Sequence, residues 1–181
     1  IANISIGSVQ IPLSKLFLSL YTDQPLFSDI LWHFRIPKAL TCLLAGSALA
    51  TAGLLMQTLF RNPMAGPDVL GLTSGASLLV ALVILLEQFS TIFKGVLFHN
   101  SWSVALAASL GGGLVFILII SIAKYVKDNA ALLIIGLMIS AATSSLVSVM
   151  QYTSKADDLQ AFLIWTLGSM GNTNWTEISV L

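Results

Sequence analysis

The sequence predicts an all-α protein, a polytopic bundle of membrane helices, because of its composition and its long stretches without charge. Of the 181 residues, 56% are hydrophobic and only 9% are charged, whereas a typical soluble domain carries about 25% charged residues. A helix needs ~20 mostly apolar residues to cross the hydrocarbon core of a bilayer. Four stretches of about that length are free of charge in their interiors and lack the single polar face of a helix from a soluble protein.

Polar or charged turns separate these predicted membrane helices. Two prolines in the segment 62–68 would interrupt a helix that continued through it, and the charged turn 124–128 separates the last two stretches. Trp102 stands at the start of the third stretch, where an indole suits the headgroup level of the membrane. The sequence therefore predicts one membrane domain over residues 1–181, with membrane helices at residues 39–60, 69–86, 102–124 and 130–152.

The segment before the first predicted membrane helix has a different character. Residues 1–34 mix short apolar pieces with Asp23, Pro25 and Asp29, so they are too often interrupted to cross a membrane. We expect them to form a loop outside the membrane, with at most one short helix near residues 13–20.

Two further helices are expected after the fourth membrane helix. Residues 159–167 are apolar but too short to cross the bilayer, which favours a short interfacial helix. Asn174 and Glu177 have the three-residue spacing of a capping box. A further membrane helix is therefore expected to begin within residues 175–181.

Charge and cysteine content exclude several classes of function. Eight basic residues balance eight acidic residues, which leaves no basic field to hold nucleic acid. Cys42 is the only cysteine, so it can form neither an intrachain disulfide nor a thiolate metal site. The sequence contains no P-loop motif for a nucleotide. We therefore expect no nucleic-acid partner, no cofactor and no metal site.

The predicted membrane helices also lack the groups that catalysis and ion coupling need. Ser74 has no histidine base in a neighbouring span, because His33 and His99 both lie outside the spans. The interiors of the spans contain no Asp, Glu, Lys, Arg or His, which disfavours a proton- or ion-coupled secondary carrier. The sequence predicts a membrane protein that is not an enzyme, and a secondary transporter and a non-transporting scaffold stay open as alternatives.

Uncharged polar residues line one face of the fourth predicted helix. Helical spacing places them on one side, and they are Ser140, Thr143, Ser144, Ser148 and Gln151. Such a stripe suits the wall of a water-lined pathway. In the alternative interpretation each hydroxyl donates to a backbone carbonyl one turn earlier and only packs; the sequence leaves both open.

Two other patterns have structural interpretations. Arg35 and Lys38 flank Pro37 at the start of the first predicted span, where basic side chains commonly anchor a helix end. Small residues recur at four-residue spacing, which lets helix backbones approach closely in lipid. The glycines expected to face protein neighbours for this reason are Gly46, Gly111, Gly112 and Gly113.

Several short motifs occur in order along the chain. They are Arg-Ile-Pro-Lys at 35–38, Ala-Gly-Ser-Ala-Leu-Ala at 45–50, Arg-Asn-Pro-Met-Ala at 61–65, Leu-Gly at 70–71 and Gly-Ala at 75–76, followed by Gly136, Trp165 and Trp175. Together these motifs resemble the FecCD-type permease family from about residue 30 onward. Lys38 and Met64 depart from the family pattern, in which Arg and Leu are usual, and Lys lacks the bidentate fork of Arg.

The resemblance implies a function in import. It implies the permease subunit of an ATP-driven, binding-protein-dependent ABC importer that carries an iron chelate (siderophore or haem) or cobalamin across the bacterial inner (plasma) membrane. A whole subunit of this family is a type II permease of about ten helices. It works as a homodimer with separate cytoplasmic ATPase subunits and an extracytoplasmic substrate-binding protein. By that comparison the chain lacks the first helix and everything after the start of the sixth.

The resemblance also assigns roles to particular residues. Basic residues at the positions of Arg35 and Lys38 meet acidic residues of the binding protein, so we expect both side chains to be open to solvent outside the membrane. Two loops narrow the cytoplasmic end of the pathway, which makes gate candidates of Asn62, Pro63, Met64, Asn129 and Ala130. The uncharged pathway residues do not distinguish among siderophore, haem and cobalamin.

The topology that the resemblance implies conflicts with the usual bias of basic residues toward the cytoplasm. The basic residues placed inside are Arg61, Lys124 and Lys127. Those placed outside are Lys15, Arg35, Lys38, Lys94 and Lys155. A docking role for Arg35 and Lys38 would account for two of the residues outside.

Overall fold

The computed structural model describes residues 25–85, 101–170, 173 and 175–178. Over these residues the chain is helical and contains no strand, which confirms the predicted all-α class. The chain divides into two compact units, Ile1–Thr51 with Ser169–Leu181 and Ala52–Gly168. Each unit is described by itself. The predicted short helix near residues 13–20 lies outside the described residues.

The first unit contains a helix that begins well before the predicted start at residue 39. Helix α3 (Pro25–Ile30) continues through a π-helical turn, η1 (Leu31–Arg35), into α4 (Ile36–Phe60). The prediction of a loop through residue 34 is therefore wrong from residue 25 onward.

The π-helical turn explains how the helix tolerates a proline. Inside an α-helix the ring of Pro37 would clash with the carbonyl four residues earlier. In η1 the backbone N–H of Ile36 instead bonds to the carbonyl of Leu31, and this wider turn is a common adjustment at such sites. Thr41 Oγ1 then donates to the carbonyl of Pro37 at 3.0 Å. The helix thus continues past Pro37 into the apolar stretch.

Two contacts join the last part of the chain to this helix. The indole Nε1 of Trp175, in α9 (Trp175–Ile178), donates to the carbonyl of Trp32 at 2.7 Å, and the two indole rings lie 6.2 Å apart. The thiol of Cys42 donates to the sulfur of Met170 at 3.3 Å. The described part of the predicted helix at 175–181 is this single turn, α9.

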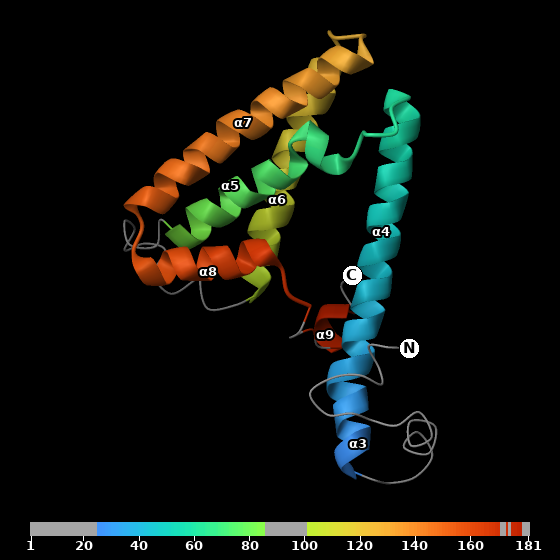
Figure 1. The fold of residues 1–181 in the computed structure, drawn as a ribbon, viewed down its shortest axis with the longest axis vertical. Helices are drawn as coiled ribbons and strands as arrows, with labels where there is room; N and C mark the ends of the chain where they lie inside the picture. Colours follow the sequence, from blue (N-terminus) through green and yellow to red (C-terminus); the bar gives the residue numbers. More distant parts are fainter. Residues whose placement is uncertain (1–24, 86–100, 171–172, 174, 179–181) are drawn as a thin grey trace. The chain divides into compact units, whose positions relative to one another are not determined.

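The second unit is a group of helices around α5. After α4 ends, its elements are η2 (Pro67–Leu70), α5 (Leu72–Leu85), α6 (Ser101–Ala123), α7 (Asn129–Thr153) and α8 (Ala156–Leu167). Helix α5 contacts α6, α7 and α8, and Figure 1 shows α5 lying between α7 and α8. The elements around α5 share two apolar clusters. One contains Phe60, Leu70, Val115 and Leu132; the other contains Val80, Leu85, Val147 and Phe162.

Three helices of the described residues are long and apolar enough to cross a membrane. They are Ser28–Phe60, Trp102–Ala123 and Asn129–Thr153. The chain is thus a multi-pass membrane protein. The segment predicted as a continuous helix at 69–86 is interrupted instead, because Gly71 takes a left-handed conformation (φ 81°) between η2 and the 14-residue α5. Helix α8 begins at Ala156, three residues before the predicted interfacial helix.

Glycines let α5 approach α6 and let α7 approach η2, the turn that precedes α5. A Cβ atom on Gly75 would lie 2.7 Å from the carbonyl oxygen of Gly111, and one on Gly111 would lie 2.3 Å from the carbonyl oxygen of Gly75. On α7, a Cβ atom on Gly136 would lie 2.5 Å from the carbonyl oxygen of Val69. These backbones pack at distances that only glycine permits.

The expected packing role holds for only some of the glycines. Gly111 is buried against α5, and a Cβ atom on Gly112 would lie 3.5 Å from the carbonyl oxygen of Leu72, which is an ordinary contact distance. Gly113 and Gly46 have open space where a Cβ atom would be, so the expectation that they face protein is wrong for the described residues. Four-residue spacing alone therefore does not identify the face that packs.

Replacing Gly111 with Ala should destabilise the protein more than the same change at Gly113. The new methyl group at Gly111 meets backbone rather than a flexible side chain, and overpacking of this kind costs about 1–3 kcal/mol or more. Thermal unfolding in detergent measures the effect, and Gly113→Ala is the control two residues away. Equal midpoints for the two variants would contradict the close contact between α5 and α6.

Candidate functional site

The stripe of polar residues on α7 divides into two parts. Thr143 Oγ1 donates to the carbonyls of Ile139 and Ser140, which is the packing arrangement. Ser140 Oγ is buried against Gly71, and the structure gives it no hydrogen-bond partner among the described residues. Ser144, Ser148 and Gln151 instead reach a cavity farther along the helix.

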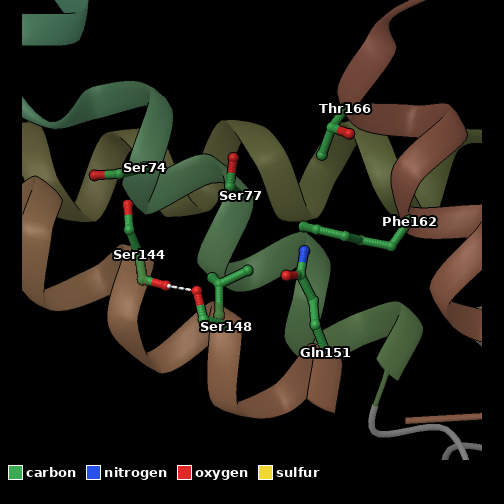
Figure 2. A pocket seen from close by; sticks show the side chains of 8 residues that line it. Ser74, Ser77, Ser144, Ser148, Gln151, Phe162 and Thr166 are labelled. Atoms are coloured by element: carbon green, nitrogen blue, oxygen red, sulfur yellow. Dashed lines mark hydrogen bonds between the residues drawn. The ribbon is translucent and has the colours of Figure 1, made fainter.

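This cavity has a volume of about 260 Å³ and lies between three helices of the second unit. We call it the hydroxyl crevice. Figure 2 shows its side chains converging from α5, α7 and α8. The residues that line it are Ser74, Ser77, Ser144, Val147, Ser148, Gln151, Phe162 and Thr166. No charged side chain is among them, so the crevice can offer only neutral hydrogen-bonding groups and apolar contact.

The helix arrangement accounts for the shape of the crevice. Phe162 of α8 is only 1% exposed and packs with Val80, Leu85 and Val147, which attaches α8 to α5 and α7. The ring of Phe162 and the side chain of Val147 form the apolar part of the wall, and hydroxyl groups form most of the rest.

Sequence reasoning missed the contributions of α5 and α8. The sequence pattern suggests Ser74 only as a candidate nucleophile and indicates no role for Ser77 or Thr166. Their spacing contains a usable signal, because Ser74 and Ser77 are three residues apart and share a helical face. The sequence alone could not show that this face meets α7, since the uncharged polar groups of α5 are few.

The gate candidates lie at the end of α4 and the start of α7. Arg61 ends α4 in a left-handed conformation (φ 48°), and the backbone N–H of Asn62 bonds to the carbonyl of Gln57 at 3.2 Å, which is a Schellman-type helix end. Met64 N donates to Asn62 Oδ1 at 2.9 Å. The side-chain amide of Asn129 donates to the carbonyl of Leu59 at 3.0 Å.

The Asn129 amide therefore links the start of α7 to the last turn of α4, directly before the loop of Asn62, Pro63 and Met64. A helix leaves its last four carbonyls without hydrogen-bond partners in the helix. The side-chain amide of Asn129 is the partner of one of these carbonyls in α4, that of Leu59. Asp128 caps the start of α7 by accepting from Ala130 N and Ala131 N, each at 3.2 Å. Pro63 and Met64 are exposed, and Met64 is 83% exposed, so the apolar tip of the loop is not covered by the described residues.

The two docking candidates differ in their exposure. Arg35 is 9% exposed and has an interaction partner, whereas Lys38 is half-buried in the first turn of α4. The expectation that both side chains are open to solvent is wrong for Arg35. A π-helical turn ends at Arg35, which changes the direction of the side chain relative to a regular helix. Among the described residues no cluster of three or more His, Cys, Asp or Glu could hold a metal ion.

Replacing Asn129 with Ala should loosen the loop after α4. The loss of one hydrogen bond costs about 1 kcal/mol, equivalent to roughly fivefold faster opening. Hydrogen exchange of the Ala65 amide, which bonds to the carbonyl of Asn62, measures this opening. Lys127→Ala, in the same exposed turn, is the control. Unchanged exchange in Asn129→Ala would show that the amide does not hold the loop.

The chain is similar to several characterised permeases. It is 32% identical to the hemin transport system permease protein HmuU of Yersinia pestis, over 98% of this chain and 53% of that protein. It is 32% identical to the vitamin B12 import system permease protein BtuC of Klebsiella pneumoniae, over 82% of this chain and 42% of that protein. The chain thus spans about half the length of the curated relatives that it matches.

The fold and a family model agree with these relatives. A solved structure described as a metal-chelate type ABC transporter in an inward-facing conformation matches with a TM-score of 0.78 and 26% sequence identity, covering 96% of this chain and 50% of that chain. The family model of the FecCD transport family matches residues 1–181. The chain therefore belongs to the FecCD transport family.

Proposed function

We propose that this chain is the membrane-spanning part of a permease subunit in an ATP-driven, binding-protein-dependent importer. The cargo is an iron chelate, haem or cobalamin. The observation that carries the proposal is the charge-free crevice between membrane helices, found in a member of the FecCD family. Relatives named for hemin and vitamin B12 transport support the class of cargo.

The mechanism follows from what these residues can do. The permease breaks no bond in its cargo; it supplies a passage whose walls move. Hydroxyl and amide groups on the wall can exchange hydrogen bonds with a bulky ligand, each with a small net free energy. The free energy for movement comes from ATP hydrolysis on separate cytoplasmic subunits, in a homodimer of the permease in the bacterial inner membrane.

The gate and docking assignments belong to the same proposal. The loop after α4 and the start of α7, which the Asn129 amide links to the last turn of α4, would narrow the cytoplasmic end of the passage, and Met64 and Pro63 would form the tip of that constriction. Lys38 would meet an acidic side chain of the substrate-binding protein. Arg35, being buried, would support the helix start beneath that surface instead of contacting the partner fully.

Replacing Ser144 with Trp in the full-length subunit should block uptake without preventing assembly, because the indole would fill the hydroxyl crevice. Leu146→Trp is the matched control, since Leu146 is 56% exposed and does not line the crevice. Uptake of radiolabelled haem, cobalamin and a ferric siderophore into cells that lack the native gene gives the readout and identifies the cargo. Normal uptake by Ser144→Trp would contradict a passage along this face. Uptake that continues without ATP would contradict the ATP-driven class.

Reversing the charge of Lys38 should weaken docking of the binding protein. Rim charges act mainly on the association rate, so Lys38→Glu should slow association several-fold at low salt and less at high salt. Surface plasmon resonance with the importer in nanodiscs measures this rate. Arg61→Glu, at the other end of α4, is the control because it carries the same charge change away from the proposed docking surface. If Lys38→Glu and the control associate with the binding protein at equal rates, Lys38 is not part of the docking surface.

A further inference from the structure

The hydroxyl crevice contains hydrogen-bonding groups that the described protein does not satisfy. Ser74, Ser148 and Thr166 donate to carbonyls of their own helices. Within the described residues, the hydroxyls of Ser77 and Ser144 and the side-chain amide of Gln151 donate to no such carbonyl, although all three line the cavity. Unused donors and acceptors thus gather around one space instead of being spread along the helices.

Such groups require a partner when they lie at membrane depth. A polar group that leaves water without a replacement hydrogen bond is destabilising in a protein interior and more so in hydrocarbon. The cavity of about 260 Å³ has room for on the order of eight water molecules at about 30 Å³ each in the liquid. Water also needs two to four polar partners to be held in such a site, and residues from α5, α7 and α8 provide them.

The two sides of α7 carry different kinds of side chain, and this difference indicates which side would contact water. Ser144, Ser148 and Gln151 follow helical spacing along the crevice side. Leu146 and Val149, at the same depth, lie outside the crevice lining. Ser144 and Ser148 are exposed, as Leu146 and Val149 are, so the two sides differ in the chemistry of their side chains and not in burial. One side of the helix suits water, and the other suits lipid or an apolar protein neighbour.

We propose that the hydroxyl crevice is a water-filled site inside a single subunit, bordered by α5 and α8 as well as by α7. Its ligand is a cluster of water molecules held by neutral hydroxyl and amide groups. Phe162 closes its apolar side. This water site rests on the proposed function in one respect, because it would form part of the wall of the proposed passage. The presence of water itself depends only on the packing of the three helices and not on transport.

The test measures how fast water-soluble thiol reagents reach single cysteines. Cys42 is first replaced by Ala, and the full-length subunit is assembled with its partners in liposomes. Ser148→Cys and Ser77→Cys are compared with Val149→Cys, which is one residue from Ser148 but outside the crevice. A positively charged methanethiosulfonate is used because it stays in water and because only the thiolate, which forms in water, reacts. Both crevice variants should react about tenfold faster than Val149→Cys, or more.

Each outcome has a defined consequence. Rates for Ser148→Cys that match those of Val149→Cys would overturn the proposal, because they would mean that other protein or lipid fills the space. Slow reaction at Ser77→Cys alone would overturn the claim that α5 borders the water. The two variants lie on different helices, so misfolding of one leaves the other as a test. Fast reaction in an importer that takes up none of the labelled cargoes would count against the proposed function and leave the water site standing.

Discussion

The second unit depends on the close approach of α5 to its neighbours. Between helices in lipid there is no hydrophobic driving force, so association relies on van der Waals contact over backbones that come near each other. The pair Gly75 and Gly111 brings α5 against α6, and Gly136 lets α7 meet the backbone at Val69 and Leu70. A single methyl group at these positions would separate the backbones. Helix α5 can therefore be short and still contact three other helices.

The same packing places the hydroxyl groups. Because glycines hold α5 against α6 and hold α7 against η2 directly before α5, Ser74 and Ser77 lie beside Ser144 and Ser148. Gly71 contributes twice, since its left-handed backbone ends η2 and its missing side chain leaves room for Ser140. Phe162 then fixes α8 on the remaining side. The crevice is thus a consequence of helix packing. Its polar side chains come from three helices and face one space.

The sequence was sufficient for the helical class and for most of the long helices, because charge-free length is a direct requirement of the bilayer. It was not sufficient where backbone geometry decided the outcome. Gly71 looks like one more small residue in an apolar run, and only its positive φ shows the break before α5. The spacing on α7 did predict residues that share a face, but which part of that face is covered depends on where η2 and α8 pack. Pro37 marks a place where the helix must adjust, but the sequence does not show that the adjustment is a π-helical turn or that Arg35 is buried there.

The neutral lining has a physical consequence for any cargo that meets it. A charge at membrane depth demands a counter-charge or a large desolvation free energy, so it would hold an opposite charge firmly and repel a like one. Hydroxyl and amide groups exchange one hydrogen-bonded partner for another with a net change of only about 1 kcal/mol each. In the proposed importer, a hydrated wall of such groups would create no deep binding well for a chelate. Selection of the cargo would then fall to a step before the membrane, and release would fall to the proposed gate residues near the end of α4 and the start of α7, where the Asn129 amide bonds to the carbonyl of Leu59.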